Sequence, residues 1–221
     1  MNHILDVTLS GTKLQLHSAR AVFWPDRETL FVADTHFGKE ATFRRHGIPV
    51  PRGSTDGTLR SLSTLISDVN AVRLVVLGDL FHARSSLSRD VCESMDVFFR
   101  KHASLNITLV RGNHDAHVGQ LPPAWPIDVV EPGIRMGAFT LTHEPSAPTS
   151  DSTLVLCGHI HPGINIRIAT QSLGRMPCFW MDNRCLVLPA FGQFTGLHCV
   201  KPKKDSRVWI VADDEIVEHV V

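Results

Sequence analysis

The sequence lacks tyrosine, carries no net charge and has no hydrophobic run long enough to cross a membrane. Its 22 lysines and arginines balance 22 aspartates and glutamates, which excludes a polybasic tail or an acidic solvating chain. No run approaches the roughly 18 apolar residues of a membrane span, and the N-terminal segment lacks the pattern of a secretory leader. Since 43% of the residues are hydrophobic, wholesale disorder is excluded as well. We expect a cytoplasmic protein without membrane contact, folded as one domain over residues 1–221.

Cysteine is scarce, and its spacing excludes a cysteine zinc site. No two of the five cysteines form a CxxC pair, and their odd number leaves at least one thiol unpaired within the chain. Cys178 and Cys185 flank a predicted hairpin around residues 182–183 and could pair across it. The alternative is that all five are reduced thiols, as is usual in the cytoplasm.

Short apolar runs predict strands, and two segments have the periodicity of amphipathic helices. The helical patterns cover Leu59–Val69 and Val91–His102. Strands alternate with helices in the first half and dominate from about residue 127, which predicts an α/β (α+β) sandwich with helices outside. The last strand is expected to form a closing hairpin with the segment that starts at Glu215. The predicted strands are Lys13–His17, Ala21–Phe23, Thr29–Ala33, Arg73–Leu77, Asn106–Val110, Phe139–Thr142, Thr153–Cys157, Gly163–Ala169, Leu186–Leu188 and Arg207–Val211.

Histidine is abundant, with 13 residues, and several histidines follow predicted strands. Side chains just beyond the carboxyl ends of sheet strands converge on one crevice. Two carboxylates, one amide oxygen and four imidazoles without a thiolate are too many ligands for one ion. This set suits two divalent ions of the manganese, iron or zinc type that share a carboxylate. The candidate ligands are Asp34, His36, Asp79, Asn113, His143, His159 and His161.

Each of these motifs also has a structural explanation when it is considered alone. An aspartate after a strand can cap a turn, and the histidines of GHIHPG at residues 158–163 could simply end a strand. Five such motifs, each after a hydrophobic run, favour a metal site instead. A non-catalytic scaffold is the competing interpretation, but a scaffold has no physical need for seven ligands.

The ordered motifs resemble those of the calcineurin-like metallophosphoesterase superfamily over roughly residues 30–165. They are D34-x-H36, G78-D79, G112-N113-H114-D115, H143 and G158-H159-x-H161. The resemblance implies a four-layer αββα sandwich and hydrolysis of a phosphate ester with two metal ions. It assigns Asp34, His36, Asp79 and His161 to one ion, and the bridging Asp79 with Asn113, His143 and His159 to the other. His114 matches the family's non-ligand active-site histidine.

The residue three positions after Asp79 distinguishes between branches of the superfamily. Protein phosphatases carry an aspartate there, whereas this chain has His82, which resembles the branch of double-strand-break repair nucleases. The segments Thr42–Pro51, Pro177–Trp180 and Leu188–Gly196 are similar to the bacterial ligase-associated DNA-damage-response endonuclease family of metallophosphoesterases. That likeness implies a manganese-dependent phosphodiesterase and endonuclease in DNA repair, encoded beside a DNA ligase, a helicase and an exonuclease. We expect a DNA substrate, single-stranded, with a double strand as the alternative.

Three catalytic roles and three DNA contacts follow as expectations. His114 is expected to protonate the leaving oxygen and His82 to face the substrate phosphate. Asp115 is expected either to orient His114 or to cap a turn. Phosphate contacts are expected from Arg44, Arg45 and Arg52, with a solvated loop as the alternative. A small-nucleotide phosphodiesterase and a phosphomonoesterase are the alternative activities.

Overall fold

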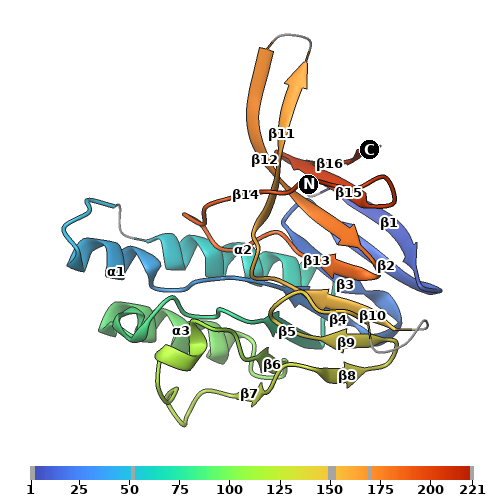
Figure 1. The fold of residues 1–221 in the computed structure, drawn as a ribbon. Coiled ribbons are helices and arrows are strands. Elements are labelled where there is room, and N and C mark those ends of the chain that lie inside the picture. Colours follow the sequence, from blue (N-terminus) through green and yellow to red (C-terminus); the bar gives the residue numbers. More distant parts are fainter. Residues whose placement is uncertain (1–2, 51–52, 149–152, 169–170, 220–221) are drawn as a thin grey trace.

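The computed structural model describes residues 3–50, 53–148, 153–168 and 171–219, whose strands form two sheets (Figure 1). In the first sheet, neighbouring strands follow chain order, and β4, β5 and β6 run parallel. This sheet contains β1 (Ile4–Leu9), β2 (Thr12–His17), β3 (Ala21–Trp24), β4 (Thr29–Val32), β5 (Arg73–Leu77), β6 (Asn106–Val110) and β7 (Ile127–Val130).

The second sheet is built from the later part of the chain. Its order is β14-β11-β12-β13-β10-β9-β8, with β15 paired to β12 and β16 to β15. The strands are β8 (Ile134–Met136), β9 (Phe139–Leu141), β10 (Leu154–Cys157), β11 (Pro162–Ile168), β12 (Gln171–Asp182), β13 (Cys185–Val187), β14 (His198–Cys199), β15 (Arg207–Ala212) and β16 (Glu215–His219). The predicted closing hairpin is confirmed as β15 and β16.

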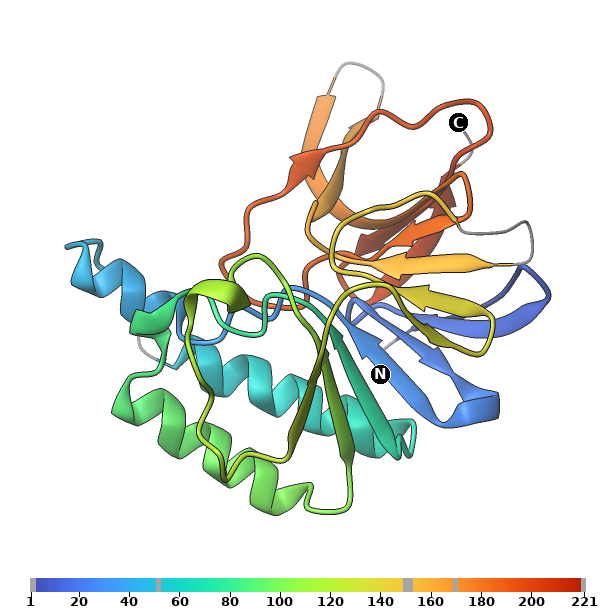
Figure 2. The same cartoon turned by 60° about the horizontal axis from the view of Figure 1, so that its bottom comes forward.

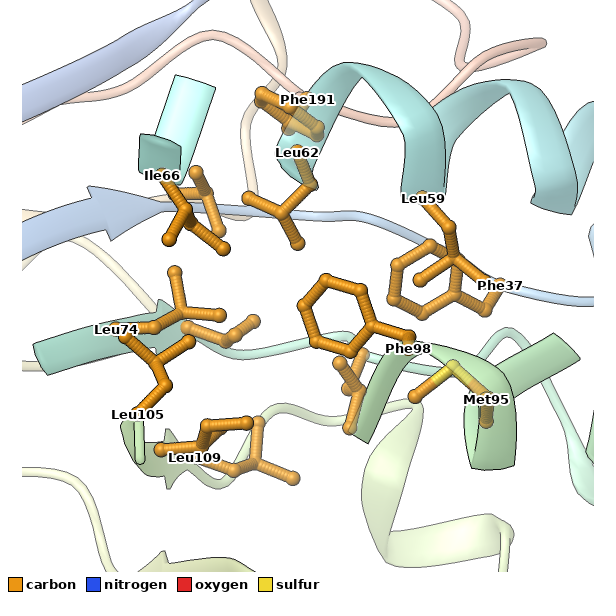
Figure 3. Packing of buried hydrophobic residues seen from close by; sticks show 14 of the residues in the cluster. Phe37, Leu59, Leu62, Ile66, Leu74, Met95, Phe98, Leu105, Leu109 and Phe191 are labelled. Atoms are coloured by element: carbon orange, nitrogen blue, oxygen red, sulfur yellow. The ribbon is translucent and has the colours of Figure 1, made fainter. Parts of the chain in front are cut away.

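The described α-helices lie on one side of the first sheet (Figure 2). They are α1 (Lys39–Arg45), α2 (Ser54–Asp68) and α3 (Arg89–Lys101); short 3₁₀ turns occur at η1 (Pro25–Arg27), η2 (Arg84–Ser86) and η3 (Asp115–His117). Leu59, Leu62 and Ile66 fall on one face of α2, as their spacing predicts, and pack with Leu74 of β5 and Phe98 of α3 (Figure 3). None of the described helices is long and apolar enough to span a membrane.

A second hydrophobic cluster lies between the two sheets. Phe31 and Val75 from the first sheet pack with Phe139, Leu156 and Trp209 from the second. All five are at most 1% exposed. Burial of these large apolar side chains holds the two sheets together, and it fixes the strand ends of one sheet relative to those of the other.

The α/β class with two packed sheets is confirmed, with one difference from the expected four layers. Within the described ranges, no helix covers the outer face of the second sheet; Val155, Cys157 and Val187 pack there against Ile160 and Trp180. The physical reason is visible in the sequence, because no helical periodicity follows His102.

The cysteines are arranged differently from the pairing considered for Cys178 and Cys185. The predicted hairpin exists as β12 and β13, but its register sets Cys185 opposite Asp182, and Cys178 pairs with Ile210 of β15. The nearest thiol to Cys185 is Cys157, at 3.5 Å between sulfur atoms. All five cysteines are free thiols.

Candidate metal centre

The candidate ligands lie where strands of both sheets end. Asp34 and His36 follow β4, Asp79 follows β5 and Asn113 follows β6, all in the parallel part of the first sheet. In the second sheet, the parallel strands β9 and β10 lead to His143, and to His159 and His161. Backbone hydrogen bonds join these loops: Asp34 N–H donates to Gly78 O at 3.1 Å, and Gly158 N–H donates to His143 O at 3.0 Å.

One group of ligand atoms consists of Asp34, His36 and His161, whose donor atoms lie within 4.8 Å of one another. The Nε2 atoms of His36 and His161 are 3.3 Å apart, and His161 Nε2 lies 3.6 Å from Asp34 Oδ1. The Asp34 carboxylate also accepts the His159 N–H at 2.9 Å, which links this group to the next one. Asp34, His36 and His161 are three of the four residues that the resemblance assigns to one ion.

The second group consists of Asp79, His143 and His159, again within 4.8 Å. Asn113 Oδ1 joins it, 2.8 Å from His143 Nε2 and 3.0 Å from His159 Nδ1. The two oxygens of Asp79 face different groups: Oδ2 lies 3.8 Å from His36 Nε2, and Oδ1 lies 3.4 Å from His143 Nε2. Asp79 therefore occupies the position expected of a shared carboxylate, between the two sets.

Hydrogen bonds to backbone carbonyls orient two of the imidazoles. His143 Nδ1 lies 3.0 Å from Leu77 O, and His161 Nδ1 lies 3.1 Å from Gly196 O. Because a carbonyl only accepts, each Nδ1 carries the proton and each Nε2 presents its lone pair to the centre. This is how ligating histidines are commonly held by their surroundings.

The electrostatics of the centre fit divalent cations. Burial, followed by the charge of Lys39 and the neighbouring imidazoles, lowers the pKa of His36 to about 2, so this ring is a neutral donor at physiological pH. Burial also raises the pKa of Asp79, against the opposing effects of His143 and of the hydrogen bond from the His114 N–H. Lone pairs and carboxylates thus converge at a partly buried centre, where a cation would satisfy them together.

Five of the seven candidate ligands have a strained, left-handed backbone. A positive φ is uncommon for a residue other than glycine, and such strain gathers at functional sites. Gly78 has φ +83°, and a Cβ atom at this position would overlap the His143 imidazole. The strained ligands are Asp34 (φ 52°), His36 (46°), Asp79 (53°), His159 (71°) and His161 (51°).

His114 and His82 lie together at the edge of the centre. Their rings stack with centroids 4.7 Å apart, and His114 Nδ1 lies 2.7 Å from His82 O. His114 Nε2 is consequently directed inward, 3.9 Å from Asp79 Oδ2. Burial, followed by the charges of Lys39 and His114, lowers the pKa of His82 to about 4. The structure thus brings both predicted catalytic histidines beside the ligands, as a pair.

Asp115 binds backbone amides around the ligands. Its Oδ2 accepts the N–H of Asp79 at 2.8 Å and of Gly112 at 2.9 Å, and its Oδ1 accepts the N–H of Phe81 at 3.3 Å. The His114 ring is oriented by His82 O instead. Of the two roles considered for Asp115, these contacts favour capping of the turn. Burial raises its pKa to about 6.

The predicted arginine contacts are set apart from the ligands. Arg44 lies on α1 with Nη2 3.8 Å from Asp90 Oδ2 on α3, and both Arg44 and Arg45 line a surface hollow between these helices. Arg52 lies outside the described residues. The DNA contacts of these arginines stay predictions.

Lys39 is a residue of the centre that sequence reasoning missed. It begins α1, and its ammonium is close enough to lower the pKa of His36 and His82. Burial lowers the pKa of Lys39 itself, and Asp34 and Asp79 oppose that shift. The signal in the sequence is its position three residues after His36, on the segment that leads away from the metal ligands.

Comparisons with known proteins agree with this geometry. The model of the family described as calcineurin-like phosphoesterase matches residues 28–161, the range that holds all seven candidate ligands. No curated protein sequence matches the chain.

Two solved structures are similar to the chain. The nuclease MPE of Pseudomonas putida has a TM-score of 0.86 and 32% identity, over 98% of this chain and 100% of that one. The phosphoesterase Yfce of E. coli has a TM-score of 0.42 and 18% identity, over 86% of this chain and 96% of that one. The similarity to the nuclease is consistent with the ligase-associated group. The family model matches most of the chain and the ligand geometry agrees with it. The chain therefore belongs to the calcineurin-like phosphoesterase family.

Proposed function

We propose that this protein is a DNA endonuclease that hydrolyses phosphodiester bonds of single-stranded DNA with two divalent metal ions. The observation that carries the proposal is the position of Asp79, whose two oxygens face two separate groups of ligand atoms. Similarity over the whole chain to a protein described as a nuclease supports the substrate class. The mixed nitrogen and oxygen donors without thiolate suit manganese, iron or zinc, and the resemblance to the ligase-associated group favours manganese among these.

The seven ligands divide into two sets that share one carboxylate. Asp79 directs one oxygen toward each set, so this carboxylate would hold the two ions close together. Such ions supply Lewis acidity toward phosphate oxygens and activate water as a nucleophile. Asp34, His36, Asp79 and His161 would hold one ion, and Asp79, Asn113, His143 and His159 would hold the other.

His114 is positioned to donate a proton to the leaving oxygen. Its Nδ1 is engaged with His82 O, and its Nε2 points toward the centre. The side chain is 36% exposed, so it can meet a substrate at the mouth of the site. His82, stacked on His114, adds a hydrogen-bond donor, and Lys39 adds positive charge, for a bound phosphate.

The biological setting is part of the same proposal and rests on the family-specific segments of the sequence. We place the protein in the cytoplasm, as one domain over residues 1–221, and in DNA repair. Its proposed functional partners are a DNA ligase, a helicase and an exonuclease.

A nuclease assay on circular single-stranded DNA tests the activity, because a circle has no end for an exonuclease. Protein stripped with a chelator and reloaded with Mn²⁺, Fe²⁺ or Zn²⁺ is expected to linearise the circle, fastest with Mn²⁺, and Asp79→Asn is the matched inactive control. Cyclic nucleotides and phosphomonoesters are assayed in parallel. Hydrolysis of these with an intact circle would replace the proposal with the alternative activities. Fewer than one ion per chain and no hydrolysis of any ester would favour a scaffold.

A further inference from the structure

The loop after β13 is attached to the metal centre at both of its ends. Near its start, Phe191 N–H donates to Ala33 O at 2.9 Å and Gly192 N–H donates to Asp34 O at 3.1 Å. Near its end, Gly196 O accepts the Nδ1 proton of the ligand His161. The residues between these points, 193–195, are therefore fixed relative to the ligand set of Asp34 and His161.

The tip of this loop is a tight turn. Thr195 Oγ1 donates to Gly192 O at 3.1 Å, which closes the turn on itself. Gly192 lies directly against the backbone of Thr35, where no Cβ atom would fit. Phe194 stands at the tip with φ +57°, a left-handed conformation that is sterically costly for an aromatic residue.

The Phe194 side chain projects into solvent, unlike Phe191 of the same loop and Phe179 of β12. It is 49% exposed, whereas Phe191 is 7% and Phe179 is 0% exposed. Phe191 packs in the core near Leu62 (Figure 3). Among the described residues, no ring or cation is paired with the Phe194 ring. The turn thus holds an apolar ring in solvent, on a loop whose backbone is hydrogen-bonded to the ligand His161, and core packing gives no reason for this.

We propose that Phe194 is the platform on which an unpaired base stacks, next to the phosphate that is cleaved. The assignment rests on the proposed function, in which the substrate is single-stranded DNA. Stacking on an aromatic ring suits every base, because each has a π-face, so it positions the strand without reading its sequence. A base inside a duplex is already stacked on its neighbours, so the platform also favours single strands.

The test compares two substrates with two variants. The substrates are a single-stranded oligodeoxynucleotide and a backbone of equal length in which tetrahydrofuran abasic sites replace all nucleosides. Phe194→Ala is expected to lower kcat/KM on the ordinary strand by about 5- to 150-fold, the usual effect of removing one stacking partner. On the abasic strand it should leave kcat/KM unchanged, because there is no base to stack. Phe194→Trp should restore cleavage of the ordinary strand.

Control measurements separate this inference from the proposed function. Val217→Ala removes apolar surface that is 51% exposed on β16, and it should change neither rate. Equal losses on both strands with Phe194→Ala, or no loss on either, would overturn the stacking role while the endonuclease assignment stands. If the wild-type protein cleaves neither strand, the proposed function fails, and the role of Phe194 fails with it.

Discussion

Replacing Gly78 with alanine is expected to dismantle one ligand set and leave the other in place. Gly78 joins β5 to Asp79 with φ +83°, and an added Cβ atom would overlap the imidazole of His143. That ring is 2% exposed, and its Nδ1 proton is donated to Leu77 O at 3.0 Å. The methyl group can be accommodated only if His143 leaves its position beside Asp79.

Two costs determine how much unfolding free energy Gly78→Ala loses. A left-handed conformation costs a residue with a Cβ atom about 1–2 kcal/mol relative to glycine. Displacing His143 leaves a buried carbonyl without its donor, which costs about 1–3 kcal/mol more. Gly11→Ala is the matched control, because Gly11 has φ +79° and nothing lies within 4 Å of its added Cβ atom. The difference between the two variants isolates the displacement of His143.

Urea denaturation, elemental analysis and the nuclease assay measure these terms together. Gly11→Ala should lose about 1–2 kcal/mol of unfolding free energy and keep the metal content and rate of the wild type. Gly78→Ala should lose more, bind one ion fewer per chain and cleave at least about 100-fold more slowly, since even changes around metal ligands cost 10–100-fold. The reasoning is refuted if Gly78→Ala matches Gly11→Ala in stability, metal content and rate.

Three further outcomes are expected. Asp79→Asn should abolish metal-dependent cleavage and raise the melting temperature of the metal-free protein, because burial raises the pKa of this carboxyl; a variant that cleaves normally contradicts the shared carboxylate. His114→Ala should slow cleavage by about 10²–10⁴-fold at unchanged metal content, and loss of both ions would make His114 a ligand. Burial lowers the pKa of His17, which is 1% exposed, to about 4. As the pH falls below 6.5, this imidazole is therefore protonated in the unfolded chain before it is protonated in the folded protein. The wild type should therefore lose about 2 kcal/mol of stability between pH 7 and pH 4.5 that His17→Leu keeps, as urea denaturation at these two pH values would measure; equal losses would contradict the assignment.

Regular patterns made several elements predictable. Arg73–Leu77 and Asn106–Val110 are strands with the predicted bounds, because a continuous apolar run of that length suits a buried parallel strand. The helix α1 was not predicted, since its seven residues are too few to show a periodic apolar face. The strand β14, with two residues, depends on pairing with β11 and has no signal of its own.

The sequence by itself determined the donor atoms of the centre and their order along the chain. Each ligand follows an apolar run, and strand ends are predictable because they depend on local composition. Only the tertiary structure decided which donors meet: it set Asp79 between two groups, joined Asp115 to backbone amides instead of to the His114 ring, and left Phe194 in solvent. These outcomes depend on contacts between residues far apart in the chain, which the packing of two sheets fixes and which no local pattern records.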